Sequence, residues 1–258
     1  MITSTQNARL KLIRALAGRP RERRSAGAFL AEGVRLVEEA HAAGWPFEFV
    51  LFSPELGARG QALVEQLQAA GVEVEPVAPE LLKTASETEA SQGLIAVLKL
   101  RDLPLPPALD FVLIPDQIRD PGNLGTLLRT AAAAGVQAVL IPPETTDPFA
   151  PKVVRAGMGA HFRLAVAGAS WETIRAQTTG CTVFLAEAQG AVSCWGADFK
   201  SRTALIVGGE AAGASQPARA LANVFVNIPM PGKIESLNAG VAGAVLMFEV
   251  VRQRNEAV

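Results

Sequence analysis

The stretch Ile228-Pro-Met-Pro-Gly-Lys-Ile-Glu-Ser-Leu-Asn238 decides the fold prediction. It joins a short apolar strand, residues 224–228, to a long helix, residues 237–254, through a loop of proline, glycine and polar residues. A helix N-terminus offers free backbone N–H groups, and Ser236 and Asn238 add side-chain donors and acceptors. In an α/β sheet, ligands bind at such junctions, outside the carboxyl ends of the strands. The stretch therefore predicts an α/β fold with a ligand site here, unless Ser236 serves only as the N-cap of the helix.

A second junction of this kind, Ile206-Val-Gly-Gly-Glu-Ala-Ala-Gly213, follows the buried strand 204–207. Gly208 and Gly209 would let a ligand approach the backbone closely, because glycine has no side chain to block it. Glu210 follows them at the carboxyl end of the strand. It could face a ligand there, or it could lie in the first turn of a helix, where the helix dipole favours a negative charge.

A third junction, Asp120-Pro-Gly-Asn-Leu-Gly-Thr-Leu-Leu-Arg129, follows the strand 111–114. Its Pro-Gly pair predicts a turn, and Asn123 is well suited to cap the following helix. Arg129 lies on an otherwise apolar helix, where burying an unpaired charge would be costly. It is therefore either an arginine at the core edge, paired with a carboxylate, or a functional cation.

The rest of the chain continues the alternation of strands and helices. Before Leu103-Pro-Leu-Pro-Pro107, whose prolines exclude a helix, short strands and helices predict a small α/β domain. After it, the strands are continuous apolar runs, as a parallel sheet covered on both faces requires. We therefore predict an N-terminal domain at 1–102, a linker at 103–108 and a C-terminal domain at 109–258. Strands of the second domain are expected at 111–114, 138–141, 163–166, 182–186, 204–207 and 224–228, and helices at 124–134, 150–158, 171–177 and 237–254.

Two common nucleotide-binding signatures do not occur in the sequence. No G-x-G-x-x-G follows a strand, and no Walker A pattern is present. A Rossmann-type cofactor enzyme is therefore disfavoured.

Together, and in their order along the chain (120–129, 206–213 and 228–238), the three junctions resemble the signature motifs of the SpoU (TrmH-type) branch of the SPOUT RNA methyltransferases. The match includes the pattern N-x-G-x-x-L-R from Asn123 to Arg129. In the N-terminal half, Thr3-Ser-Thr-Gln-Asn7, Arg24 and Phe29-Leu-Ala-Glu-Gly33 resemble the small substrate-binding domain of ribosomal-protein-like fold that precedes the catalytic domain in many members. The resemblance implies a C-terminal catalytic domain with a trefoil knot, which no periodicity argument predicts.

The resemblance also implies the chemistry, which is transfer of a methyl group from S-adenosylmethionine to a ribose 2′-hydroxyl of RNA. The catalytic positions would be Asn123, Arg129, Glu210, Ser236 and Asn238. The cofactor would be held by Gly208, Gly209, Ile228, Met230 and Leu237. The family's arginine is a proposed base. Because a guanidinium holds its proton tightly, we favour a role for Arg129 in binding the target phosphate and assisting deprotonation of the hydroxyl. Ala211 stands where glycine is frequent in the family.

The charge distribution bears on how RNA would be held. The formal net charge is −1, so RNA contacts must come from local patches. Basic residues cluster between positions 9 and 24, and we predict that part of this cluster binds RNA, namely Arg9, Arg21, Arg23 and Arg24. The alternative is that these charges only face solvent.

Other features set the cellular context. Cys181 and Cys194 match no zinc or redox spacing, the N-terminus has no apolar signal-peptide core, and no apolar run is long enough to span a membrane. We expect a cytoplasmic enzyme without metal or membrane association, acting on rRNA or tRNA, with rRNA favoured. The resemblance further implies a homodimer.

Two other functions stay open at this point. One is a non-catalytic RNA-binding or ribosome-assembly factor on the same fold, which would have no need of Arg129, Glu210, Ser236 and Asn238 together. The other is a small-molecule methyltransferase, against which the basic N-terminal cluster argues.

Overall fold

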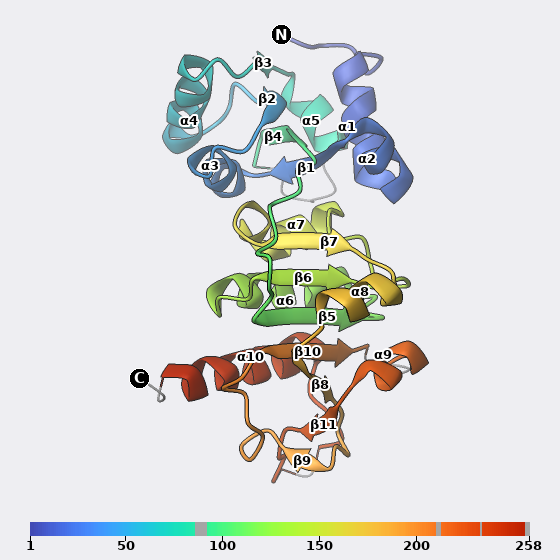
Figure 1. The fold of residues 1–258 in the computed structure, drawn as a ribbon. Coiled ribbons are helices and arrows are strands. Elements are labelled where there is room, and N and C mark those ends of the chain that lie inside the picture. The colour runs from blue at the N-terminus through green and yellow to red at the C-terminus, as the bar shows by residue number, and fades with distance from the viewer. Residues whose placement is uncertain (86–91, 210–212, 233, 256–258) are drawn as a thin grey trace. The chain divides into compact units, whose positions relative to one another are not determined.

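The structure is a computed structural model that describes residues 1–85, 92–209, 213–232 and 234–255. Its contacts divide the chain into two compact units (Figure 1). The first comprises Met1–Arg101 and Phe149–Phe162, and the second comprises Asp102–Pro148 and Arg163–Val258. Residues 149–162 therefore pack with the first unit, whereas the domain ranges predicted from the sequence place them in the second.

The N-terminal unit is built on a four-stranded mixed sheet in the order β1-β4-β2-β3. The strands pair antiparallel except for β2 with β3. Its strands are β1 (Ala28–Glu32), β2 (Phe47–Phe52), β3 (Val74–Pro76) and β4 (Leu94–Lys99). Its helices are α1 (Ala8–Gly18), α2 (Pro20–Ala26), α3 (Val34–Ala42), α4 (Ala58–Ala69), α5 (Pro79–Ala85), α7 (Pro151–Gly157) and the short 3-10 helix η1 (Ala160–Phe162).

The core of this unit follows from the helical spacing of apolar residues in α1. Leu10, Ile13 and Leu16 are fully buried and pack with apolar residues of the sheet and of α5. The segment 149–162 adds aromatic contacts, since the Phe149 ring lies 5.1 Å from that of Phe29. These contacts explain why a segment that follows strand β6 (Ala138–Ile141) in the chain belongs to the N-terminal unit.

The C-terminal unit is built on a seven-stranded sheet in the order β7-β6-β5-β10-β8-β11-β9, and every pairing in it is parallel. The α/β fold with a parallel sheet is thus confirmed, while the trefoil knot stays a prediction. The strands are β5 (Phe111–Asp116), β6 (Ala138–Ile141), β7 (Ala165–Gly168), β8 (Thr182–Ala186), β9 (Val192–Ser193), β10 (Thr203–Gly208) and β11 (Val224–Asn227). The helices are α6 (Pro121–Ala133), α8 (Trp171–Gln177), α9 (Gln216–Leu221) and α10 (Ala239–Asn255).

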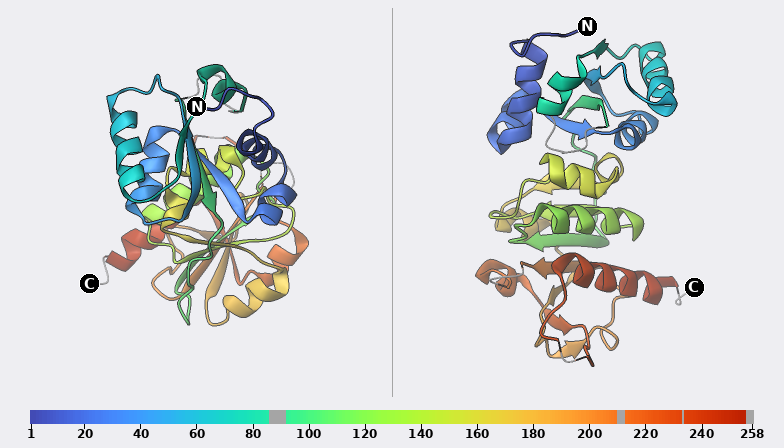
Figure 2. Two further views of the ribbon diagram at one scale, coloured as in Figure 1. Left: turned by 90° about the horizontal axis from the view of Figure 1, so that it is seen from above. Right: turned by 180° about the vertical axis from the view of Figure 1, so that it is seen from behind.

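Helices cover both faces of this sheet, as its apolar strands require. Figure 2 shows α6 and α10 together on one side, and α8 with α9 on the other. The helices α6 and α10 approach closely, because a β-carbon at Gly243 would overlap the side chain of Leu127. Glycine at this position therefore fixes how the last helix lies on the sheet.

Helix caps differ from those predicted. Asp120 rather than Asn123 caps α6, since its Oδ1 accepts a hydrogen bond from the Asn123 backbone N–H at 2.8 Å. At α10, Asn238 takes the cap position, because its Oδ1 accepts from the Val241 N–H at 3.2 Å and its carbonyl accepts from Ala242. Ser236 precedes this cap, which removes its purely structural interpretation as the N-cap.

Candidate functional site

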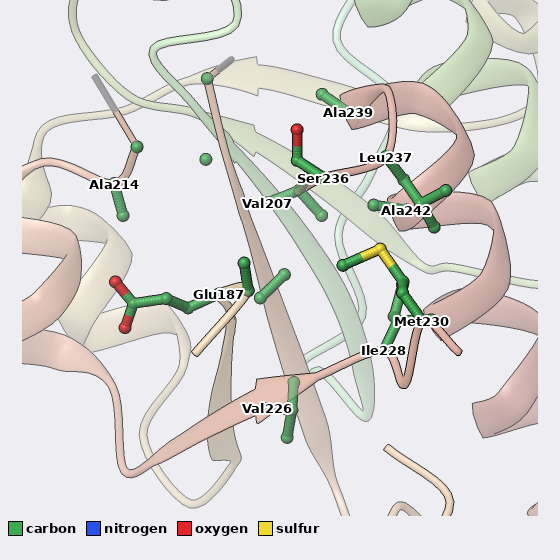
Figure 3. A pocket seen from close by; sticks show the side chains of 15 residues that line it. Glu187, Val207, Ala214, Val226, Ile228, Met230, Ser236, Leu237, Ala239 and Ala242 are labelled. Carbon is green, nitrogen blue, oxygen red and sulfur yellow. The ribbon is translucent and has the colours of Figure 1, made fainter. Parts of the chain in front are cut away.

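A cavity of about 300 Å³ lies at the carboxyl ends of the central strands (Figure 3). The loops after β8, β10 and β11 and the entry to α10 supply its walls. The lining residues are Ala186, Glu187, Ala188, Val207, Gly208, Gly209, Gly213, Ala214, Val226, Ile228, Met230, Ser236, Leu237, Ala239 and Ala242. This volume lies at the lower end of the range for small-molecule sites, roughly 300–1,000 Å³.

The glycine wall of the cavity leaves no space for larger residues. A β-carbon at Gly208 would lie 2.9 Å from the backbone N of Ala214 and 3.0 Å from the backbone carbon of Gly213. A β-carbon at Gly209 would overlap the carbonyl oxygen of Gln117. Both glycines are therefore required where the chain leaves β10, which exposes backbone groups to the cavity.

The opposite wall is apolar. Ile228, Met230, Leu237 and Ala242 lie together on one side of the cavity in Figure 3, with Glu187 and Ala214 across from them. All five residues expected to hold the cofactor line this cavity, and so does Ser236. A flat apolar group would fit between these walls while backbone groups at the strand ends bind its polar atoms.

The residues at the carboxyl end of β8 were missed by the sequence analysis. Ala186, Glu187 and Ala188 line the cavity, and the Glu187 carboxylate forms an ion pair with Arg219 of α9. Their position could have been found from one signal, because β8 is parallel to β10 and its carboxyl end lies at the same edge of the sheet.

The first and third junctions meet directly. The Asn238 Nδ2 donates a hydrogen bond to the Asn123 Oδ1 at 2.8 Å, although the two residues are 115 positions apart. Asn238 is followed by Ala239 and preceded by Ser236 and Leu237, all of which line the cavity. The two asparagines thus form a polar pair beside the cavity, at the start of α10.

Arg129 and Glu210 are not part of this pair. Arg129 is exposed on α6, and it forms no ion pair within the described part of the chain. The alternative of an arginine at the core edge, paired with a carboxylate, is therefore not supported. Glu210 lies outside the described residues. The structure therefore brings together Asn123, Ser236 and Asn238 and leaves Arg129 facing outward.

The sequence matches two protein families. The SpoU rRNA Methylase family matches residues 110–248, which is more than half of the chain. The chain belongs to the SpoU family. The MRM3-like substrate binding domain matches residues 7–96 of the N-terminal unit.

Two relatives of this SpoU protein match it over nearly its whole length. It is 33% identical over 264 residues to the 23S rRNA (uridine(2479)-2'-O)-methyltransferase of Streptomyces viridochromogenes, covering 97% of this chain and 92% of the relative. It is 30% identical over 255 residues to the 23S rRNA (guanosine(2553)-2'-O)-methyltransferase RlmP of Bacillus subtilis, covering 96% and 98%. Among solved structures, the SpoU methyltransferase AviRb from Streptomyces viridochromogenes, in complex with the cofactor AdoMet, matches with a TM-score of 0.87, 31% identity and coverage of 97% and 99%.

The basic cluster of the substrate-binding domain is only partly available for RNA. Arg23 is buried, with 2% of its surface exposed, and its Nη1 donates to the Leu16 carbonyl at 2.6 Å. The expectation that Arg23 contacts RNA is therefore wrong. Its guanidinium instead ties α2 to the end of α1.

Arg9 is likewise committed within the fold. Its guanidinium pairs with Glu73 and Glu75 and lies over the Phe49 ring at 5.1 Å. The side-chain hydrogen bond to Glu73 raises the pKa of Arg9. Arg21 and Arg24 are exposed on α2, so of the four predicted RNA-binding arginines these two remain accessible to a phosphate.

Two further properties concern the described residues alone. Among the residues that the structure describes, no group of three or more His, Cys, Asp and Glu residues is arranged to hold a metal ion. No helix found in them is long and apolar enough to cross a membrane.

Proposed function

We propose that this SpoU protein transfers a methyl group from S-adenosylmethionine to a ribose 2′-hydroxyl of rRNA. One observation carries the proposal: the cavity at the carboxyl ends of β8, β10 and β11 is bounded by the Ser236–Ala239 segment, whose Asn238 bonds Asn123. The relatives named above are methyltransferases that act on the ribose 2′-oxygen of 23S rRNA.

The residues that line the cavity fit S-adenosylmethionine in chemistry. The glycine wall, which a β-carbon would fill, offers backbone hydrogen-bonding groups for adenine and ribose. The apolar wall of Ile228, Met230 and Leu237 suits the flat face of a purine. When bound, S-adenosylmethionine supplies an electrophilic methyl group.

The protein's own residues act mainly by positioning. The Asn123–Asn238 hydrogen bond fixes both side-chain amides at the entry to α10, so they can orient the ribose without reorganising. Ser236, whose side chain lines the cavity, adds a hydroxyl that can donate or accept a hydrogen bond near the same point. Excluding water around the 2′-hydroxyl would then strengthen each of these contacts.

Arg129 fits a role as phosphate anchor. A guanidinium remains protonated at neutral pH, so it cannot readily take the proton of the 2′-hydroxyl. It can bind a phosphate of the target nucleotide through two parallel hydrogen bonds and so lower the cost of charge developing on the oxygen. Its exposure on α6 leaves it accessible to RNA.

We assign RNA capture to the first unit, residues 1–101 with 149–162, and methyl transfer to the second unit, residues 102–148 and 163–258. The match of the substrate-binding domain to residues 7–96 supports this division. Arg21 and Arg24 of α2 are the cations proposed to contact RNA in the first part. We place the enzyme in the cytoplasm, where rRNA would be its substrate.

We further propose that the enzyme is a homodimer and that Arg129 reaches the site of the partner chain. Val241 and Phe248 of α10 are 47% and 50% exposed, which favours contact with a second copy through this helix. Asn123 bonds Asn238 within one chain, so Arg129 is the residue left to act across the interface.

Complementation tests the shared site. An inactive Arg129→Ala chain mixed with an inactive Asn238→Ala chain should regain partial activity, because some heterodimers contain one intact composite site. If the mixture is dimeric but stays inactive, Arg129 and Asn238 act within one chain.

Mapping of 2′-O-methyl groups tests the function itself. RNA from cells with and without this protein should differ at one or a few rRNA nucleotides, and the missing mark should return with the wild-type gene but not with Asn238→Ala. An identical map of rRNA and tRNA in both cell lines would instead support a non-catalytic RNA-binding factor on this fold.

A further inference from the structure

A buried carboxyl group lies behind the glycine wall of the cavity. Asp116 is the last residue of β5, is fully buried and pairs in register with Gly208 of β10. Its Oδ2 accepts a hydrogen bond from the Ser215 backbone N–H at 2.6 Å. Its Oδ1 is also buried and has no hydrogen-bond partner among the described residues.

Such a group does little for the stability of the fold. A buried carboxylate with one unbonded oxygen loses the hydration of that oxygen without replacement. Burial raises the pKa of Asp116, and the charge of Glu144 acts in the same direction, while the hydrogen bond from Ser215 opposes them. A buried polar atom that has no partner in the described part of the chain needs an explanation, and a functional role is one of them.

The hydrogen bond of Asp116 reaches the arm of the loop that returns toward the cavity. Gly213 and Ala214 line the cavity, and the next residue, Ser215, is the N-cap of α9. Gly213 bridges Gly209, so the two arms of this loop touch directly. Asp116 therefore fastens the returning arm at its base, from the neighbouring strand.

Backbone strain marks the same place. Gln117, directly after Asp116, has a φ of 53°, in the left-handed region that residues other than glycine rarely adopt. Its carbonyl oxygen is the atom that excludes a β-carbon at Gly209. Strain of this kind persists where the surroundings hold it, often at binding sites.

We infer that Asp116 is a positioning residue for S-adenosylmethionine binding, which it promotes by holding the Gly213–Ser215 arm against Gly208 and Gly209. The inference rests on the proposed function, because it requires that the cavity bind S-adenosylmethionine. Asp116 does not line the cavity, so it acts through the loop. Without its hydrogen bond, the Gly213–Ser215 arm would adopt several positions, and the apparent affinity would fall with the fraction of molecules in which this arm lies against Gly208 and Gly209.

The test uses the full chain and two substitutions at one position. Asp116→Ala removes the acceptor for the Ser215 N–H, whereas Asp116→Asn keeps an acceptor oxygen and removes the charge. The matched control is Thr203→Val at the opposite end of β10, where the buried Thr203 hydroxyl donates to the Ser201 carbonyl at 2.8 Å, away from the cavity. Calorimetry gives the dissociation constant for S-adenosylmethionine, and thermal unfolding gives Tm for each variant.

The expected result separates affinity from stability. Asp116→Ala should weaken S-adenosylmethionine binding by roughly tenfold to a hundredfold, the range for losing one hydrogen bond to a charged group. Asp116→Asn should recover much of this loss and have a Tm above that of the wild type at neutral pH. Thr203→Val should lower Tm without changing affinity.

Two results would overturn the inference in distinguishable ways. Wild-type protein that fails to bind S-adenosylmethionine would remove the cavity assignment and the inference with it. The second result is a wild-type protein that binds S-adenosylmethionine and a folded Asp116→Ala variant that binds it with the same affinity. A loss of affinity that the unfolded fraction of the variant fully explains would count in the same way. Either finding would refute the role of Asp116 and leave the proposed function standing.

Discussion

Replacing Gly208 by alanine should weaken S-adenosylmethionine binding by moving the wall of its site. The added β-carbon would lie 2.9 Å from the Ala214 N and 3.0 Å from the Gly213 carbon, both of them backbone atoms that cannot rotate away. The returning arm of the loop must therefore shift. Overpacking of this kind costs about 1–3 kcal/mol, which corresponds to a roughly 5-fold to 150-fold rise in the dissociation constant if the cost falls on the position of this arm that binds the cofactor.

Calorimetric titration with S-adenosylmethionine measures this change, and Gly232→Ala is the control. Gly232 lies in the loop between β11 and α10, and a β-carbon there would meet nothing within 4 Å. The control should bind as the wild type does. A folded Gly208→Ala protein with wild-type affinity would show that the Gly208 loop is not a wall of the cofactor site.

Three further outcomes follow from the charges and exposed surfaces. Replacing Arg21 and Arg24 with alanine should reduce the dependence of log K for rRNA binding on log salt concentration by up to roughly 0.9 per lost phosphate contact, using the duplex DNA value as a proxy. The control is Arg59→Ala, which removes an arginine that is ion-paired with Glu38 and should leave this slope unchanged. An unaltered slope in the Arg21 and Arg24 variant would mean that these two arginines only face solvent. Burial raises the pKa of Asp116 in the folded state, so the charged form of this residue destabilises the fold at neutral pH. Asp116→Asn should therefore have a higher Tm than the wild type at neutral pH and lose this advantage as pH falls toward about 4. A difference in Tm that stays constant with pH would contradict a buried charge at Asp116. Phe248→Asp should yield monomers in sedimentation experiments, and a dimer of unchanged affinity would place the interface elsewhere.

The sequence predicted those features that depend on local pattern. Continuous apolar runs located the strands of the parallel sheet, and the Gly208-Gly209 pair after a buried strand located one wall of the cavity. The strand expected at 163–166 lies instead at Ala165–Gly168, and β9 and α9 were not predicted, since segments this short carry little periodicity.

Features that depend on distant neighbours could not be predicted in this way. Arg23 is buried because the Leu16 carbonyl at the end of α1 accepts its hydrogen bond, which charge counting along the chain cannot reveal. Asn123 was expected to cap its own helix, but Asp120 takes that position and leaves the Asn123 side chain for Asn238. The packing of residues 149–162 with the N-terminal unit depends on aromatic contacts with Phe29 and Trp45.

The most direct test of the enzyme's activity follows the methyl group to its acceptor atom. Purified protein is incubated with unmodified rRNA and methyl-labelled S-adenosylmethionine, the RNA is digested, and the nucleosides are identified by mass spectrometry. We expect the label in a 2′-O-methylnucleoside. The Asn238→Ala variant should transfer little or no label, because it lacks the side chain that donates a hydrogen bond to Asn123. Label on a base, or no label transferred by folded wild-type protein to any rRNA, would contradict the account.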